Sequence, residues 1–398
     1  MGSDPTVRVS RAARIPDSIR LARFRHAPEL GARVLFFSGG TALRGVSRCL
    51  VDYTHHSRHL ITPFDSGGSS AHLRRAFRMP AVGDLRNRLM ALADQSVLGN
   101  PEIYHLFAFR FPKEASDSDL RSWLSGMVRG VDPQIRAIPE PMRSIITSHL
   151  GFFQEAMPKS FDLAGAAIGN LVLAGGYLNQ GRKLDSVLYL FSQLVEVRGV
   201  VRPVVDRNLH LVAHLEDGTT IVGQHLMTGK EVPPLDSPVI ELHVTKSLSD
   251  PVPYRPRIGE AVDDLIRTAD LICYPMGSFY TSIVATLLPE GVSDAIAATD
   301  VPKVYVPNPG RDPEELGMGL LDKVRTLERY LTEGVSGRVA GSLLDIVLLD
   351  RGAAGVTLKE IRQVEKLGVR VLDVPLVSDE QPPMIDDRRL AEALLSLA

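Results

Sequence analysis

Short apolar runs that end in glycine-rich loops recur through this chain, and they predict buried strands that lead into helices. Residues 34–37 (VLFF) form the first run, which stops at a Ser-Gly-Gly-Thr loop at 38–41. Residues 60–64 form the second run and end at Asp65 and another glycine pair. A third loop then brings Asp84 to a new helix start. Three such loops within about fifty residues are more than a purely structural segment needs, so the pattern indicates a ligand site.

The same pattern returns in the second half of the chain. Further strands are expected at residues 271–274, 304–306, 345–349 and 369–372, and a terminal helix at 386–398. Repeated strand–loop–helix units predict an α/β fold, in which helices cover a mostly parallel sheet. In open sheets of this kind the ligand lies beyond the carboxyl ends of the strands, which is where Asp65 is expected.

Two segments depart from this alternation. Residues 100–160 have a mixed helical pattern punctuated by prolines and are expected to form an inserted helical region. Residues from about 200 to 258 change to a strand period around an Asp-Gly turn, which predicts a small antiparallel β lobe. The arginine-rich residues 1–30 are expected to be a solvated, partly helical lead-in, and residues 31–398 a single domain.

Composition and charge narrow the functional classes. The chain has 398 residues, of which 44% are hydrophobic and 23% charged, so a well-packed soluble protein is expected. The net charge of −2 and an aromatic content of 6% argue against a nucleic-acid partner or an anionic membrane surface. Two distant cysteines fit a reducing compartment, and no apolar run reaches the roughly 18–20 residues of a membrane span. A cytoplasmic location is therefore expected.

Asp65 and Asp84 are the candidate catalytic and metal-binding residues. Asp65 could hold a ribose hydroxyl or a divalent metal, or could simply cap its own glycine turn. Asp84 could ligate a metal or act as a helix N-cap. Because both follow strand ends of one presumed half-sheet, a shared Mg²⁺ site is favoured, since this cation is typically held by one or two carboxylates together with ligand phosphates.

The remaining candidates are backbone and side-chain groups at helix starts. Glycine turns also occur without any ligand, and the loop at 38–41 lacks both the P-loop lysine and the G-x-G-x-x-G pattern of dinucleotide sites. Ser69 and Ser70 could cap the helix that follows them. Arg74 belongs to a helix face that is either solvated or able to clamp a phosphate. Hydroxyl groups near 278–282 either cap a helix or line a site.

Asn170 lies in the middle of an apolar helix expected at 163–177. An unsatisfied buried amide costs about 1–3 kcal/mol, so this side chain must have a polar partner.

Five ordered segments together resemble the CofD-like family of 2-phospho-L-lactate transferases. The segments are SGGTALRG at 38–45, DSGGSSAHLR at 65–74, GDLRNRLMAL at 83–92, IGNLVLA at 168–174 and ADLICYPMGSFYTSIVATLL at 269–288. They are most similar to the YvcK-type branch of the family, the gluconeogenesis factors. Ser38 and Ala42 stand where the phosphate loop of this branch has glycines.

The resemblance implies a Rossmann-like three-layer α/β/α fold with a ligand cleft over the strand ends. The transferases of the family move phospholactate from a GDP-linked donor with Mg²⁺, whereas the YvcK-type proteins bind UDP-sugars and regulate metabolism. Carried over by motif, Asp65 and Asp84 would form the acidic, metal-binding pair. The residues that would contact phosphates or line the nucleotide region are Gly39, Gly40, Thr41, Ser69, Ser70, Arg74, Asn87, Asn170, Gly277, Ser278 and Tyr280.

Three functions stay open from the sequence. The first is an enzyme that transfers a substituted phosphate group, using a nucleoside-diphosphate-linked ligand and Mg²⁺. The second is a non-catalytic regulator that senses a UDP-sugar, and the third is a nicotinamide-dependent oxidoreductase in which Asp65 binds ribose. The acceptor, the base and the oligomeric state also stay open, with a homodimer as one candidate assembly.

Overall fold

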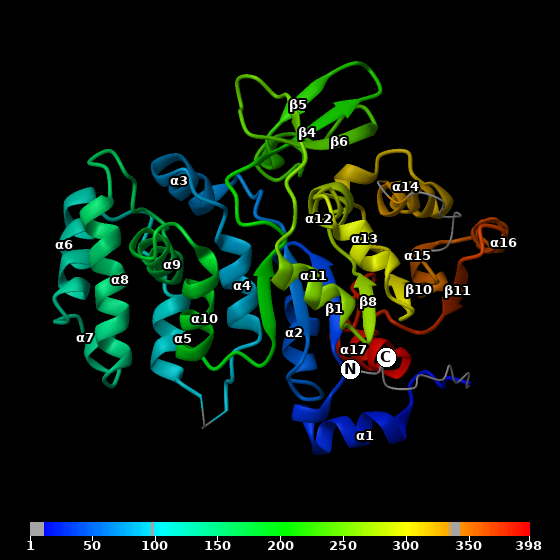
Figure 1. The fold of residues 1–398 in the computed structure, drawn as a ribbon, viewed down its shortest axis with the longest axis horizontal. Coiled ribbons are helices and arrows are strands. Elements are labelled where there is room, and N and C mark those ends of the chain that lie inside the picture. The colour runs from blue at the N-terminus through cyan, green and yellow to red at the C-terminus, as the bar shows by residue number, and fades with distance from the viewer. Residues whose placement is uncertain (1–11, 97–98, 334, 336–342) are drawn as a thin grey trace, which may run out of the picture.

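Seven parallel strands form the central sheet of the computed structural model, which describes residues 12–96, 99–333, 335 and 343–398 (Figure 1). The strand order is β11-β10-β9-β8-β1-β2-β3. The strands are β1 (Val34–Ser38), β2 (Arg58–Ile61), β3 (Val200–Pro203), β8 (Leu271–Tyr274), β9 (Lys303–Tyr305), β10 (Ile346–Leu349) and β11 (Arg370–Asp373). The α/β fold predicted from the apolar runs is therefore confirmed, with every pair in this sheet parallel.

Helices cover both faces of the sheet because each central strand is apolar on both sides. In β1, Val34 and Phe36 join the core beneath one helical layer, whereas Leu35 and Phe37 join the core beneath the other. The first layer contains α1 (Ser18–His26), α2 (Arg44–Leu50) and α17 (Asp387–Leu397). The second contains α11 (Glu260–Arg267), α13 (Val292–Ala297), α14 (Leu320–Thr332) and α16 (Leu358–Glu365).

A helical region with its own hydrophobic core adjoins the β3 edge of the sheet (Figure 1). It contains α3 (Gly68–Phe77), α4 (Gly83–Ala91), α5 (Pro101–Ala108), α6 (Asp117–Val128), α7 (Pro133–Arg136), α8 (Met142–Ala156), α9 (Ile168–Asn179) and α10 (Leu184–Leu194). The first ten residues of α9 are all buried. Residues 100–160, where the proline-punctuated pattern predicts an inserted helical region, contribute α5 to α8, whereas α3, α4, α9 and α10 lie outside those bounds.

A four-stranded antiparallel sheet forms the β lobe at the top of Figure 1. Its strands are β4 (His210–Leu215), β5 (Thr220–Val222), β6 (Val239–Thr245) and β7 (Pro253–Tyr254). Gly218 turns the β4–β5 hairpin with φ of 89°, a left-handed conformation that glycine adopts without strain. The Asp-Gly signal for a hairpin is thus confirmed.

The start of the predicted lobe is wrong, because residues 200–203 belong to the central sheet. Strand β3 pairs in parallel with β2, and its Val200 lies opposite Arg58. A four-residue strand with alternating burial looks the same at the edge of a parallel sheet as in an antiparallel lobe. The lobe itself begins only at His210.

The described part of residues 1–30 is partly helical and mostly exposed, as the expectation of a solvated lead-in requires, but it is also anchored to the rest of the fold. Helix α1 packs against α17, with Leu21 buried between them and the Arg20 guanidinium donating to the Ser396 carbonyl at 3.1 Å. The backbone N–H of Asp17 donates to Ser396 Oγ at 2.8 Å. Residues 1–11 lie outside the described part of the chain. No helix among the described residues is long and apolar enough to span a bilayer.

Candidate functional site

The strand order reverses between β1 and β8, where the chain turns to build the other half of the sheet. Loops that leave two adjacent strands in opposite directions open a crevice, which is the usual ligand position in such sheets. A cleft of about 730 Å³ lies there. Its wall includes most of the predicted site residues, namely Gly39, Gly40, Thr41, Asp65, Ser69, Ser70, Asp84, Asn87, Asn170, Gly277 and Ser278.

The loop after β1 is packed tightly between two other cleft elements. A Cβ atom on Gly40 would lie 1.9 Å from Asp84 Oδ1, and one on Gly39 would lie 2.4 Å from Ser282 Oγ. The backbone of this loop therefore contacts the first turn of α4 on one side and the π-helix η3 (Phe279–Val284) on the other. A side chain at either position would enter space that these oxygen atoms fill, so Asp84 or Ser282 would have to move to admit it.

Arg88 binds the same loop on the side that faces away from the cleft. This side chain is fully buried and does not line the cleft. Its guanidinium donates to the carbonyl oxygens of Leu43 at 2.8 Å, of Gly39 at 3.1 Å and of Gly40 at 3.2 Å, and also to Ser47 Oγ.

The orientation of these carbonyl groups fixes the amides that follow them. In a planar trans peptide the N–H points opposite to the C=O. The N–H groups of Gly40 and Thr41 are therefore turned away from Arg88, toward the cleft, and they have no acceptor among the described residues. Free amides in a glycine loop are suited to an anionic ligand.

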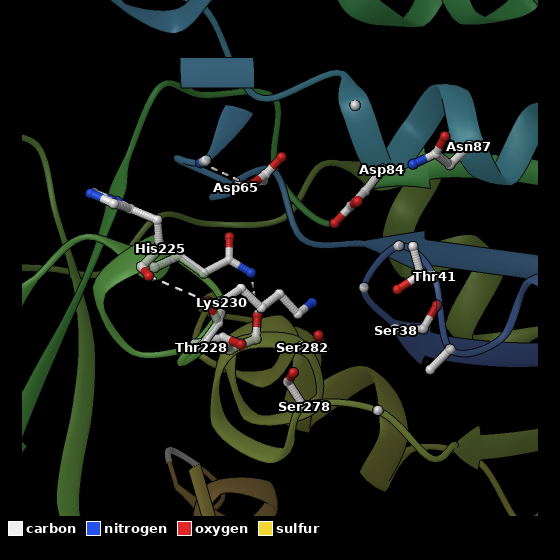
Figure 2. Close-up of a pocket in the computed structure, with 18 of the residues that line it drawn as sticks. Ser38, Thr41, Asp65, Asp84, Asn87, His225, Thr228, Lys230, Ser278 and Ser282 are labelled. Atoms are coloured by element: carbon white, nitrogen blue, oxygen red, sulfur yellow. Dashed lines mark hydrogen bonds between the residues drawn. The ribbon is translucent and has the colours of Figure 1, made fainter. Parts of the chain in front are cut away.

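The two carboxylates lie together on the cleft wall, where Figure 2 shows them beside Thr41 and Lys230. Asp65 Oδ1 accepts from Gly67 N at 3.1 Å, so this side chain caps its turn and still lines the cleft. Burial, together with the nearby charge of Asp65, raises the pKa of Asp84 to about 7. Neither carboxylate has an ion-pair partner within the described part of the chain.

This donor set fits a divalent cation. Asp84 resists ionisation because it is buried and because Asp65 is charged nearby, and a positive ion bound by both carboxylates would offset both effects. No group of three or more acidic, histidine or cysteine side chains with metal-binding geometry occurs in the described residues. Water and ligand oxygens would therefore complete the coordination, as is common for Mg²⁺.

The predicted roles of Arg74 and Tyr280 are wrong, because neither side chain lines the cleft. Arg74 is buried, and its guanidinium donates to the carbonyl oxygens of Phe64 at 2.8 Å and Leu209, which ties the β2 loop to the lobe. The Tyr280 hydroxyl donates to the Val239 carbonyl at 2.9 Å. Both polar heads are thus used within the fold, which the spacing of residues along a helix cannot reveal.

The predicted helix caps also differ. Helix α3 begins at Gly68 with Gly67 as its N-cap, and α4 has Val82 as its N-cap, so Ser69, Ser70 and Asp84 lie inside first turns. Ser69 Oγ instead accepts a hydrogen bond from Asn170 Nδ2 at 3.1 Å, which supplies the polar partner that the sequence demanded for the asparagine. Asp84 is consequently free to face the cleft.

The amides at the start of η3 are already occupied by acidic side chains. Asp312 Oδ2 accepts from Phe279 N at 2.7 Å, while Glu314 Oε2 accepts from Tyr280 N at 2.9 Å and from Thr281 N at 2.8 Å. Burial, followed by the charge of Asp312, raises the pKa of Glu314 to about 8. This helix start is therefore not an anion site, and the free amides lie on the β1 side of the cleft.

Several cleft residues were missed by sequence reasoning. Lys230 comes from the β lobe, interacts electrostatically with Asp84 and Asp312, and points into the cleft in Figure 2. His225 lies next to it, and its Nδ1 is 2.8 Å from Ser66 Oγ. Other missed residues are Arg86, Arg110, Asn308, Arg311 and Asp312. A polar segment between two lobe strands was the available signal for His225 and Lys230.

These features define an α/β protein with a doubly wound parallel sheet and a ligand cleft at the point where its strand order reverses. The sequence profile described as 2-phospho-L-lactate transferase CofD matches residues 34–381, and the chain belongs to this family. The family and the fold suggested by the five sequence segments are thereby confirmed.

Relatives and solved structures agree with this assignment. The gluconeogenesis factor of Bacillus subtilis is 28% identical over 304 residues, which cover 75% of each chain. The putative gluconeogenesis factor of Thermotoga maritima is 26% identical over 306 residues, or 76% of each chain. A crystal structure of a UPF0052 family member from Bacillus halodurans has a TM-score of 0.66 at 24% identity, covers 92% of this chain and 99% of its own, and shows the same fold.

Proposed function

We propose that the cleft binds a nucleoside-diphosphate-linked ligand together with Mg²⁺. The observation that carries this proposal is the placement of the free Gly40 and Thr41 amides beside the Asp65–Asp84 pair, on one wall of one cavity. Amides of this kind suit phosphate oxygens, and the carboxylates suit the cation that accompanies a diphosphate. Lys230 on the lobe side adds a second positive charge for the same group.

Asp65 and Asp84 would hold the Mg²⁺ ion, which supplies positive charge to the phosphate oxygens when bound. In the enzymatic form of the proposal, a hydroxyl of an acceptor attacks the distal phosphorus of a GDP-linked donor. The bond from that phosphorus to the oxygen bridging the two phosphates breaks, a nucleoside monophosphate leaves with that oxygen, and the proton of the attacking hydroxyl passes to the solvent. The Gly40 and Thr41 amides would bind the negative charge that develops on the phosphate oxygens.

The second candidate is a non-catalytic regulator that binds a UDP-sugar in the same cleft. Relatives named as gluconeogenesis factors support this regulatory candidate, whereas the family's description as a 2-phospho-L-lactate transferase supports the enzyme. The two candidates share every contact described above. They differ in whether an acceptor enters the cleft and product is released.

Isothermal titration tests the proposal. The protein is titrated with UDP-glucose, UDP-N-acetylglucosamine, GDP and GMP, each with Mg²⁺ and with excess chelator. We expect Mg²⁺-dependent heat for at least one diphosphate ligand, and a complete lack of heat would overturn the proposal. Formation of a nucleoside monophosphate from a GDP-linked donor over a panel of alcohols favours the transferase, whereas tight binding without product favours the regulator.

The pH dependence of Mg²⁺ binding follows from the raised pKa of Asp84. A carboxyl group with a pKa of about 7 is largely protonated at pH 6, and the proton must leave before the metal binds. Mg²⁺ affinity is expected to fall about tenfold for each pH unit below 7 and to level off above it. Titrations between pH 5.5 and 8.5 measure this, and equal affinity at pH 6 and pH 8 would contradict it.

Substitution of Gly40 by alanine tests the close contact between the loop and Asp84. The new Cβ atom would lie 1.9 Å from Asp84 Oδ1, so the flexible carboxylate must turn away while the backbone stays in place. We expect Mg²⁺ affinity to fall roughly 10- to 100-fold with little loss of thermal stability. Gly259→Ala is the matched control, because a Cβ there meets no atom within 4 Å. Unchanged Mg²⁺ binding by the Gly40 variant would contradict the geometry.

A further inference from the structure

A loop of the β lobe lies across the cleft and joins two of its walls. Residues 229–234 make up this loop, which we call the strap. At its base, a Cβ atom on Gly229 would lie 3.4 Å from Pro313 Cβ, so the strap packs on the segment that follows β9. At its tip, Glu231 Oε1 accepts from the backbone N–H of Gly68 at 3.0 Å, at the start of α3.

The order of the strands shows what the strap crosses. In the central sheet, β9, β8, β1 and β2 are consecutive neighbours. The segments that follow β9 and β2 therefore flank the two loops that follow β8 and β1, between which the cleft opens. A connection from Pro313 to Gly68 spans this crevice. Lys230, which belongs to the strap, points into the cleft in Figure 2.

The strap is held weakly compared with the segments on either side of it. Met227 before it and Leu235 after it are both buried, with exposed fractions of 1% and 9%. Four of the six strap residues are exposed, and the backbone of the strap forms no hydrogen bond in the described part of the chain. Exposed segments without backbone hydrogen bonds open at a low cost in free energy. The strap can thus move while both of its ends stay fixed.

The contact that closes the strap is opposed by a neighbouring charge. Glu231 Oε1 and Asp65 Oδ1 accept from adjacent amides, those of Gly68 at 3.0 Å and of Gly67 at 3.1 Å. A Cβ atom on Gly67 would lie 2.7 Å from the first oxygen and 3.6 Å from the second, so the two carboxylates are near neighbours. Because like charges repel each other, the hydrogen bond to Gly68 is easily broken.

The closed strap leaves room for a ligand. The cleft has a volume of about 730 Å³ while Glu231 is bonded to Gly68. Cavities of roughly 300–1,000 Å³ hold ligands of the size of a drug or a cofactor. The strap can therefore cover a ligand that is already in the cleft, and it obstructs a ligand that approaches from outside.

We propose that the strap is a gate, which Glu231 latches to Gly68 and which opens each time a ligand enters or leaves the cleft. The gate rests on the proposed function, because the ligand that it admits is the nucleoside-diphosphate-linked molecule proposed above. A latch that closes over both the free and the occupied cleft slows entry and exit by the same factor. It therefore sets the rate of ligand exchange and leaves the affinity almost unchanged.

Association and dissociation rates test the gate. Surface plasmon resonance is recorded on immobilised protein with Mg²⁺ and with UDP-glucose, UDP-N-acetylglucosamine, GDP and GMP in turn. For each ligand that binds, we expect Glu231→Ala to raise both rate constants at least fivefold while Kd changes less than twofold. Glu231→Gln keeps an acceptor without the charge and should give a smaller rise in both. Asp236→Ala removes an exposed aspartate of the same lobe and is expected to match the wild-type protein.

A residue that contacts the ligand would behave differently, because its loss mainly raises the dissociation rate and so weakens binding. If Glu231→Ala raises the dissociation rate alone, or changes neither rate, the gate is overturned while the proposed function stands. Binding by Glu231→Ala but not by the wild-type protein would support a more tightly closed gate. If no ligand binds to either protein, the proposed function fails and the gate fails with it. A melting curve for each variant checks that the fold is intact.

Discussion

Asp84→Asn is expected to lower Mg²⁺-dependent ligand affinity roughly 100-fold, which corresponds to about 2.8 kcal/mol, while the protein stays folded. Asparagine keeps the shape of the side chain but removes the negative charge that would hold the cation. The loss should appear in titrations with Mg²⁺ and should be absent from titrations with chelator, where the wild-type protein also lacks the metal contribution. Asp250→Asn, which changes an exposed aspartate on the β lobe, is the matched control.

The change in stability caused by the same substitution also has a predictable sign. The folded-state pKa of Asp84 is raised above its unfolded value, so the ionised form is disfavoured by folding, and stability is lost as pH rises from about 4 toward 7. Without metal, Asp84→Asn should therefore melt at a higher temperature than wild type at pH 8, with the difference shrinking at pH 5. Thermal denaturation in chelator measures this. A variant that binds Mg²⁺ and ligand as wild type does would refute the assignment of the metal site.

Arg88→Met is expected to destabilise the protein by about 3–5 kcal/mol, because several carbonyl oxygens lose their donor and each unsatisfied buried group costs about 1–3 kcal/mol. The substitution leaves the carbonyl oxygens of Gly39, Gly40 and Leu43 without their donor, and the hydrogen bonds to Gly39 and Leu43 are buried. The glycine loop loses its fixed orientation at the same time, so ligand binding should fail even where the variant is folded. Urea denaturation and titration at low temperature separate the two effects.

The control for this variant is Arg75→Met, which removes an exposed arginine from α3. A surface substitution of this kind usually changes stability by less than about 0.5 kcal/mol. If Arg88→Met lost no more than the control, the guanidinium would not be what holds the loop. If it were destabilised but bound ligand normally after refolding, the loop would keep its shape without Arg88.

Most of the strands and the convergence of the glycine loops could be predicted from the sequence. The reason is physical: the runs at β1, β8, β9 and β10 are buried on both faces, and such strands have a strong apolar signal. Asp65 could be found because it follows the apolar run of β2. The expectation that Asp84 also follows a strand end is wrong, because helix α3 precedes α4 and only the glycine at the helix start marked this residue. Edge strand β3 has only partial burial, and its parallel pairing with β2 depends on the return of the chain from the whole helical region.

The arginines show what could not be predicted. Arg74, Arg86 and Arg88 are arginines on two successive helices. Arg74 and Arg88 hold loops of the fold together, whereas Arg86 lines the cleft. Their roles are decided by which carbonyl groups lie within reach, and those carbonyls belong to loops distant in sequence. The spacing of residues along one helix predicts the direction of a side chain, but it does not predict which hydrogen-bond acceptors of other segments lie near that side chain.

The pairing of β1 with β8 also constrains how the chain is made. Val34 lies opposite Leu271, and the backbone N–H of Arg33 donates to the Asp270 side chain, 237 positions further along the chain. A ribosome that adds roughly 5–20 residues per second needs on the order of 10 to 50 s to bridge this interval. For that time one side of β1 has no neighbouring strand, so the nascent first half exposes an apolar edge to which other chains can add. Newly synthesised protein should therefore depend on chaperones until the second half has emerged.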